Sequence, residues 1–151
     1  EEVNVLREIC EKNQICALTE RSRSGHGAHI WIFFEKAIPA EKARKFGDAL
    51  LEKGTESVNL KTFQSYDRMI PAQNHLPEGG LGNLIALPLQ GRALKKGNSV
   101  FIDKNWKPFE NQWKQLGKVK RLSEEIVLRN GSGRRKHRWW KKFLNRGKRE
   151  L

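Results

Sequence analysis

Hydrophobic residues occur along the chain either every three to four positions or in short continuous runs, and the first pattern predicts helices. Apolar side chains every three to four positions among charged residues predict an amphipathic helix over residues 2–13. The same spacing predicts a helix from Pro39, a residue tolerated in a first turn, to a stop at Gly54. It also predicts helices over residues 109–116 and 121–128. The apolar positions of the first helix are Val3, Leu6, Ile9 and Cys10.

Shorter apolar runs, rich in β-branched and aromatic residues, predict strands between these helices. They cover residues 15–19, 28–34, 63–70, 84–89 and 99–103. Polar or Gly- and Pro-rich connections separate them, and we expect the first two strands to be neighbours. The predicted fold class is therefore α/β in the α+β sense, with a mixed or antiparallel sheet flanked by helices.

A polar loop, RSRSGHG, joins the first two predicted strands. Gly25 and Gly27 can adopt positive φ angles, so the loop can turn tightly and expose backbone N–H groups. The following strand would hold His29 at its start. Hydroxyl and cationic donors complete a set suited to an anion such as a triphosphate: Arg21, Ser22, Arg23 and Ser24. The alternatives are a plain connection between strands and, for His29, a hydrogen-bonded edge histidine.

The net charge of +13 and the pI near 10.1 indicate a polyanionic partner, with nucleic acid as the first expectation. Residues 131–151 hold nine Lys or Arg against one acidic residue, together with Trp139 and Trp140. We predict a basic tail, flexible or helical, that binds single strands by stacking and counterion release; the alternative is a solvated or membrane-surface helix. Its candidate contacts are Arg134, Arg135, Lys136, Arg138, Lys141 and Lys142.

The cysteines, the apolar runs and the absence of some catalytic motifs limit the classes of function that the sequence supports. Cys10 and Cys16 form no zinc-binding pattern, and we expect reduced thiols in a cytoplasmic protein. No apolar run approaches the ~20 residues of a membrane span, so we predict no membrane partner. There is no Walker-type lysine and no Cys/His nucleophile pairing. A start at Glu1 rather than Met predicts a fragment or processed chain.

Four stretches carry a resemblance to a known family: SGHGAH at 24–29, SYDRMIP at 65–71, GNLIALPLQ at 82–90 and GNSVFID at 97–103. Over residues 1–116 the chain resembles the primase-polymerase domain of the archaeo-eukaryotic primase superfamily, in the version found in TOTE conflict systems. The resemblance implies an RRM-like catalytic core that acts as a primase or DNA polymerase in DNA replication. Its expected partners are nucleoside triphosphates, DNA or RNA, and helicase and nuclease modules of the same system.

The resemblance also implies roles for particular residues. The second family motif, of the form SGxGxH, would make a nucleotide-binding set of Arg23, Ser24, Gly25, Gly27 and His29. Asp67 is the best match to the third motif, a ligand for Mg²⁺ or Mn²⁺, so the catalytic candidates are Asp67 and His29. A surface ion pair with Arg68 is the alternative for Asp67. Asp103 is a rival carboxylate, for which a turn position is the expected role.

One family motif has no match. A pair of metal-binding carboxylates should precede the helix at residues 2–13, and we expect the chain alone to be inactive without it. The predicted organisation is a partial primase-polymerase domain at 1–116, a helical extension at 117–130 and the basic tail at 131–151. The runner-up function is a decayed, non-catalytic module that binds nucleic acid.

Overall fold

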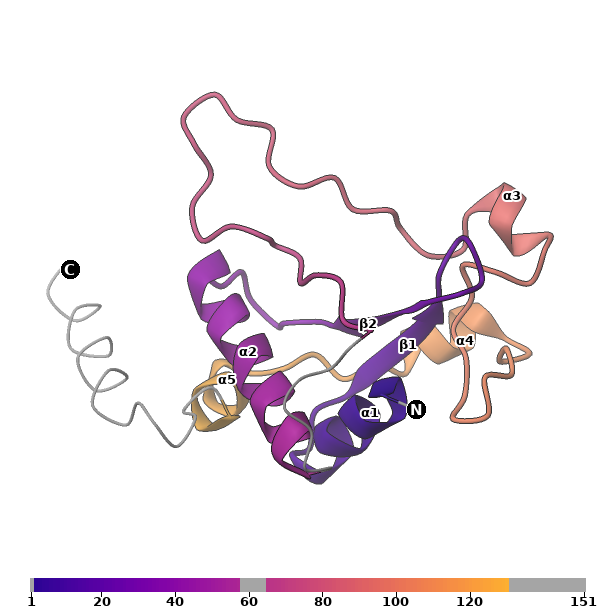
Figure 1. The fold of residues 1–151 in the computed structure, drawn as a ribbon, viewed down its shortest axis with the longest axis horizontal. Helices are drawn as coiled ribbons and strands as arrows, with labels where there is room; N and C mark the ends of the chain where they lie inside the picture. The colour runs from indigo at the N-terminus through magenta and orange to yellow at the C-terminus, as the bar shows by residue number, and fades with distance from the viewer. Residues whose placement is uncertain (1, 58–64, 131–151) are drawn as a thin grey trace, which may run out of the picture.

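The computed structural model describes residues 2–57 and 65–130 as helices packed on a small antiparallel sheet (Figure 1). The mixed α+β class expected from the sequence is confirmed. The first predicted strand begins at residue 17 rather than 15, and the helix expected at 109–116 begins at Gln112. The elements are α1 (Glu2–Lys12), β1 (Ala17–Arg21), β2 (Ala28–Ile32), α2 (Ala40–Ser57), α3 (Gly91–Leu94), α4 (Gln112–Gly117) and α5 (Glu124–Asn130).

Strands β1 and β2 form a hairpin, and two further segments extend it at its edges. Next to β1, residues 99–102 run antiparallel, with the Arg21 N–H donating to the Val100 carbonyl at 2.8 Å. Next to β2, the Leu122 N–H donates to the Phe33 carbonyl at 2.7 Å. The strand predicted at 99–103 is therefore present only as isolated bridges, one from Phe101 to Glu20 of β1 and one from Ile102 to Pro108.

The two faces of the hairpin differ. Ala17 and Ile32, which are paired across the strands, pack against the hydrophobic core formed with the helices. Because side chains alternate along a strand, Glu20, paired with His29, points to the opposite face, and Trp31 shares that face. The hairpin thus separates the helical core from a polar and aromatic surface.

The core lies where α1, α2 and α5 meet one face of the sheet. Phe46 of α2 is 1% exposed and meets Phe34 edge to face, with ring centroids 6.3 Å apart. Leu122 and Val127 bring residues of the predicted extension into this core. The buried members are Ile9, Cys10, Ile15, Phe46, Leu50, Leu122 and Val127.

The two cysteines are free thiols in different environments. Burial raises the pKa of Cys10 to about 11, while Cys16 is partly exposed. Thiolate is the reactive form, so iodoacetamide at neutral pH should alkylate Cys16 and leave Cys10 unmodified in the folded protein. Peptide mass mapping before and after unfolding checks this, and equal modification of both thiols in the native state would contradict the burial of Cys10.

The prediction that Gly54 ends the second helix is wrong, because α2 continues to Ser57. Glycine lowers helix stability by about 1 kcal/mol, which neighbouring interactions can offset. Here the hydroxyl of Thr55 donates to the Glu52 carbonyl and that of Ser57 to the Gly54 carbonyl, each at 2.8 Å. These bonds satisfy carbonyl groups in the last turn of the helix.

The strands predicted at 63–70 and 84–89 are also wrong for the described residues, since 65–70 and 84–89 are irregular. Residues 65–71 instead lie along α2, where the Arg44 guanidinium donates to the Pro71 carbonyl at 2.8 Å. A strand requires a pairing partner, and neither described stretch is paired in a sheet. Residues 63 and 64 lie outside the described part of the chain.

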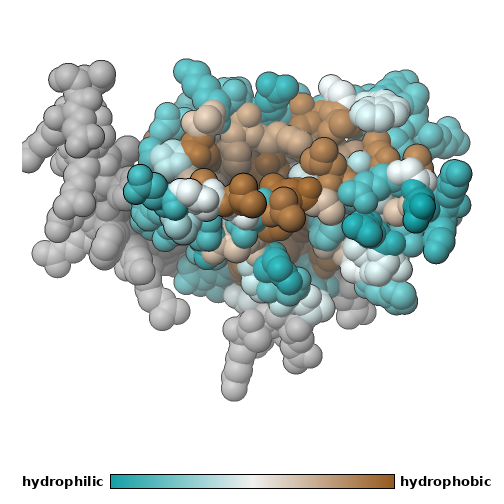
Figure 2. Space-filling model, turned by 90° about the horizontal axis from the view of Figure 1, so that it is seen from above, coloured by the Kyte–Doolittle hydropathy of each residue, from teal (hydrophilic) through white to brown (hydrophobic). Residues whose placement is uncertain are grey.

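Segment 65–90 consequently exposes apolar side chains as it arches over the top of the molecule in Figure 1. Figure 2, viewed from above, shows hydrophobic residues gathered at the centre of this face with hydrophilic residues around them. Leu84, the first residue of one predicted strand, is 93% exposed. The exposed apolar residues of the segment are Tyr66, Ile70, Leu76, Leu81, Leu84, Ile85 and Leu87.

Candidate functional site

The loop between β1 and β2 is a tight turn closed by Ser22. The Ser22 N–H donates to the Gly27 carbonyl at 2.8 Å, and the Gly27 N–H donates back to the Ser22 hydroxyl at 3.1 Å. The Gly25 N–H donates to the Ser22 carbonyl at 3.0 Å, and Gly25 has φ +83°, a conformation that favours glycine. The sequence prediction of a turn with positive φ therefore holds at Gly25.

The donors that this loop offers to a ligand differ from those expected. The N–H groups of Gly25 and Gly27 are used within the loop, whereas those of Arg23 and Ser24 have no protein partner among the described residues. The Ser24 hydroxyl lies 3.1 Å from that of Ser22. Arg23 and Ser24 are both exposed. Two backbone donors, two hydroxyls and one guanidinium thus belong to the same solvent-facing turn.

Arg21 has a structural role rather than facing the loop. Its guanidinium donates to the Gly97 carbonyl at 2.9 Å and also to the Trp106 carbonyl. These bonds attach the end of β1 to the segments around residues 97 and 106. Arg21 contributes positive charge near the loop, but two of the five N–H donors of its guanidinium are already bound to backbone oxygens.

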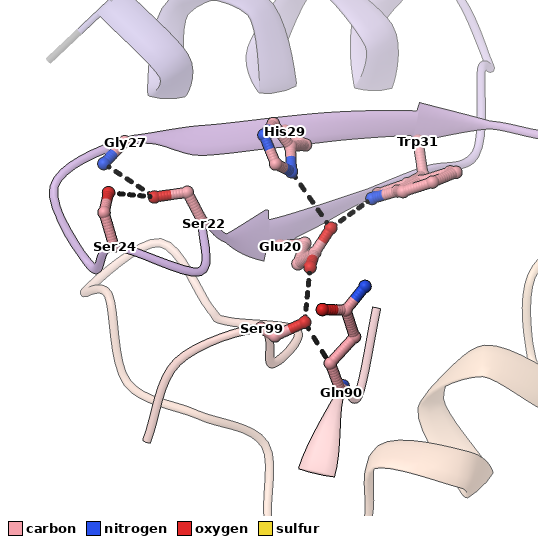
Figure 3. Close-up of polar contacts among 8 residues, drawn as sticks. All are labelled: Glu20, Ser22, Ser24, Gly27, His29, Trp31, Gln90 and Ser99. Carbon is pink, nitrogen blue, oxygen red and sulfur yellow. Dashed lines mark hydrogen bonds and ion pairs between the residues drawn. The ribbon is translucent and has the colours of Figure 1, made fainter. Parts of the chain in front are cut away.

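His29 is joined to a buried carboxylate that sequence reasoning missed. Glu20 is 1% exposed, and its Oε2 accepts a hydrogen bond from Trp31 Nε1 at 2.7 Å and lies 3.1 Å from His29 Nδ1. Oε1 of Glu20 accepts from the Ser99 hydroxyl at 2.9 Å (Figure 3). The only signal for Glu20 in the sequence was that an acidic residue stands between the apolar part of the first strand and the loop. The strand register is what shows that it lies opposite His29.

The aromatic residues after His29 divide between the two faces of the sheet. Phe34 packs on Phe46 in the core. Trp31 and Phe33 stack on each other on the other face, with centroids 6.3 Å apart and ring planes 16° apart. Both rings are partly exposed, so this face presents an aromatic pair next to His29.

Asp67 lies in irregular chain, with a side chain 78% exposed and an ion pair to Arg68 at 3.0 Å. Asp103 occupies a turn, as expected: its Oδ1 accepts from the N–H groups of Asn105 at 2.8 Å and Lys107 at 2.9 Å. Across residues 2–57 and 65–130, no three His, Cys, Asp or Glu side chains gather in a way that could hold a metal ion.

The sequence model of the TOTE conflict system archaeo-eukaryotic primase domain matches residues 1–130. The chain belongs to this family. No curated protein matches the chain. The family match includes the loop, His29, Glu20 and the Ser99 segment, so these contacts all lie within the primase domain.

Two other sequence predictions concern the basic tail and association with a membrane. The basic residues proposed to contact nucleic acid, 134–142, lie outside the described part of the chain. None of the described helices combines the length and the apolar character needed to cross a bilayer.

Proposed function

We propose that the loop at residues 22–27, together with His29, binds the triphosphate of a nucleoside triphosphate. The observation that supports this most directly is the cluster of donors on one exposed turn. The N–H groups of Arg23 and Ser24 are free of protein partners within the described chain. Backbone donors, hydroxyls and a guanidinium are the groups that bind phosphate oxygens in proteins.

His29 extends this site from the loop onto the sheet. Its side chain is 50% exposed while Nδ1 is held by Glu20, which leaves the rest of the ring accessible to a ligand. The overall charge of +13 would attract a triphosphate electrostatically. Family membership supports the same assignment, because a primase domain uses nucleoside triphosphates as substrates.

Metal-dependent nucleotidyl transfer requires a carboxylate site that the described residues do not fit. Hard divalent ions such as Mg²⁺ and Mn²⁺ take oxygen ligands, and the described residues hold no cluster of three candidate side chains. Asp67 is largely exposed and paired with Arg68. We therefore propose nucleotide binding for the described residues and assign them no step of nucleotidyl transfer.

A second candidate function is non-catalytic binding of nucleic acid. The excess of positive charge and the lack of a described carboxylate cluster favour it. In this case the loop would only connect two strands, and affinity would come from cationic groups distributed over the surface. Substitution of Ser24 or His29 would then leave the affinity for nucleic acid unchanged.

Calorimetric titration with ATP separates these functions. We expect saturable binding, weakened about tenfold in Ser24→Ala and in His29→Ala, because each loses a hydrogen bond to a charged ligand. His75→Ala is the matched control: this histidine is also exposed but lies on segment 65–90, so binding should be unchanged. Adenosine without phosphates should bind far more weakly than ATP.

The titration has a clear contrary outcome. If ATP does not bind, while single-stranded oligonucleotides bind in a salt-sensitive manner that is indifferent to Ser24→Ala and His29→Ala, the second function is correct. Circular dichroism of each variant shows that the fold is retained.

A further inference from the structure

The most unusual polar group outside the loop is the buried carboxylate of Glu20. Burial of a charged group is costly unless hydrogen bonds compensate for it. Glu20 is 1% exposed and is hydrogen-bonded to three side chains, those of His29, Trp31 and Ser99. Two of these partners follow in β2, while the third is distant in sequence, so the carboxylate joins separate segments of the fold.

We propose that Glu20 is a positioning residue that sets which nitrogen of His29 faces the ligand. This inference rests on the nucleotide-binding function proposed above. An ionised carboxylate only accepts hydrogen bonds, so the Nδ1 atom at 3.1 Å must carry the proton. Hydrogen bonding at one ring nitrogen determines the tautomer of a histidine, and Nε2 is then the atom left for the ligand.

The geometry of the strands supports this role. Glu20 and His29 are directly paired across the hairpin, so their side chains leave the same face of the sheet. Figure 3 shows the second ring nitrogen of His29 on the side away from Glu20. Trp31, two residues further along β2, donates to the same oxygen at 2.7 Å and so limits movement of the carboxylate.

Ser99 holds the carboxylate from the opposite side. Its hydroxyl donates to Glu20 Oε1 at 2.9 Å, and its backbone has φ 56°, which is uncommon for a residue other than glycine. The Ser99 N–H donates to the Arg21 carbonyl at 3.0 Å, and its carbonyl accepts from Leu89 N–H at 2.7 Å. A strained residue that is held by this many bonds is typical of functional positions.

The test observes the His29 ring directly by two-bond ¹H–¹⁵N correlation spectroscopy, at alkaline pH and without nucleotide. We expect the Nδ1–H form in the wild type and in Glu20→Gln, whose side-chain oxygen can still accept from Nδ1. We expect Glu20→Met to populate the other tautomer, because the acceptor is gone. Glu35→Met is the matched control, since it makes the same change at an exposed carboxylate beyond the end of β2, away from His29.

ATP affinity provides the second readout. Glu20→Met should weaken binding about tenfold, by analogy with the loss caused by removing the outer partner of a metal-binding histidine, whereas Glu35→Met should change it less than threefold. An Nε2–H ring in the wild type, or an unchanged ring spectrum in Glu20→Met, would overturn the proposal. If Glu20→Met does not fold, the wild-type and Glu20→Gln spectra still decide it.

The two readouts separate this inference from the function on which it rests. An Nδ1–H ring that depends on Glu20, in a protein that binds no ATP, would refute nucleotide binding and retain the positioning of His29. ATP binding with an Nε2–H ring would refute the positioning role alone.

Discussion

Substitution of Gly25 by alanine is expected to weaken ATP binding by about thirtyfold without unfolding the domain. Gly25 has φ +83°, where an alanine costs roughly 1–2 kcal/mol. A Cβ at this position would lie 2.9 Å from Oδ1 of Asn98, whose amide donates to the Arg23 carbonyl at 3.2 Å. Displacing Asn98 would add about 1 kcal/mol.

This substitution should affect binding more than removal of one side chain does. The strain disfavours the loop conformation that brings Ser22, Ser24 and the backbone donors together, and apparent affinity falls with the population of that conformation. These two costs add to roughly 2–3 kcal/mol, and the lower end, about 2 kcal/mol, corresponds to about thirtyfold. Calorimetric titration measures the affinity, and thermal unfolding shows whether the fold is preserved.

Gly27→Ala is the matched control on the same loop. A Cβ there would find its nearest atom, the Ser22 hydroxyl oxygen, at 3.6 Å, which is ordinary contact, and Gly27 is not among the residues with positive φ. We expect ATP binding within about threefold of wild type, since surface substitutions without strain have small effects. Equal losses in Gly25→Ala and Gly27→Ala would show that the turn geometry is not what binding depends on.

The largest effect on stability is expected from Phe46→Ala. Phe46 is 1% exposed, belongs to the core shared by α1, α2 and α5, and meets Phe34 edge to face. Removing a buried phenylalanine side chain costs about 3–5 kcal/mol through lost burial and the cavity that remains. Since small domains are stable by only about 5–15 kcal/mol, urea titration should show a much lower midpoint.

Phe33→Ala provides the comparison for this prediction. Phe33 is the same residue type on the opposite face of the sheet, partly exposed and stacked on Trp31. Its loss should lower the free energy of unfolding by less than half as much as Phe46→Ala, because less apolar surface is buried. If the two variants lost the same stability, the assignment of the core to the helical face would be wrong.

Local patterns in the sequence were sufficient for α1, α2, α4 and α5, though not for the short α3, and for the hairpin that carries the site. Helical spacing located α1, α2 and α5 within a few residues, because an amphipathic stripe follows the helix period. The glycine loop between two apolar runs located β1, the turn and β2. Motifs in the same stretch also indicated the primase family, which the match over residues 1–130 shows.

The strand predictions at 63–70 and 84–89 failed over the described residues for a physical reason. Apolar, β-branched composition describes a segment that can pair, but pairing depends on a neighbour that local sequence does not specify. Residues 99–102 found such a neighbour in β1, whereas 84–89 did not among the described residues. Similarly, α2 continues beyond Gly54, where the Thr55 and Ser57 hydroxyls donate hydrogen bonds to backbone carbonyls of the last turn. The expectation that glycine ends a helix does not take such bonds into account.

The sequence by itself determined the helical periods, the tight turn at Gly25 and the family to which the domain belongs, because these depend on residues close together in the chain. Only the tertiary structure decided that Glu20 lies opposite His29 and that Ser99, which is distant in sequence, donates a hydrogen bond to the same carboxylate. Strand register and the approach of residues 79 positions apart set these contacts. A local sequence pattern specifies neither the strand register nor which distant residues come together.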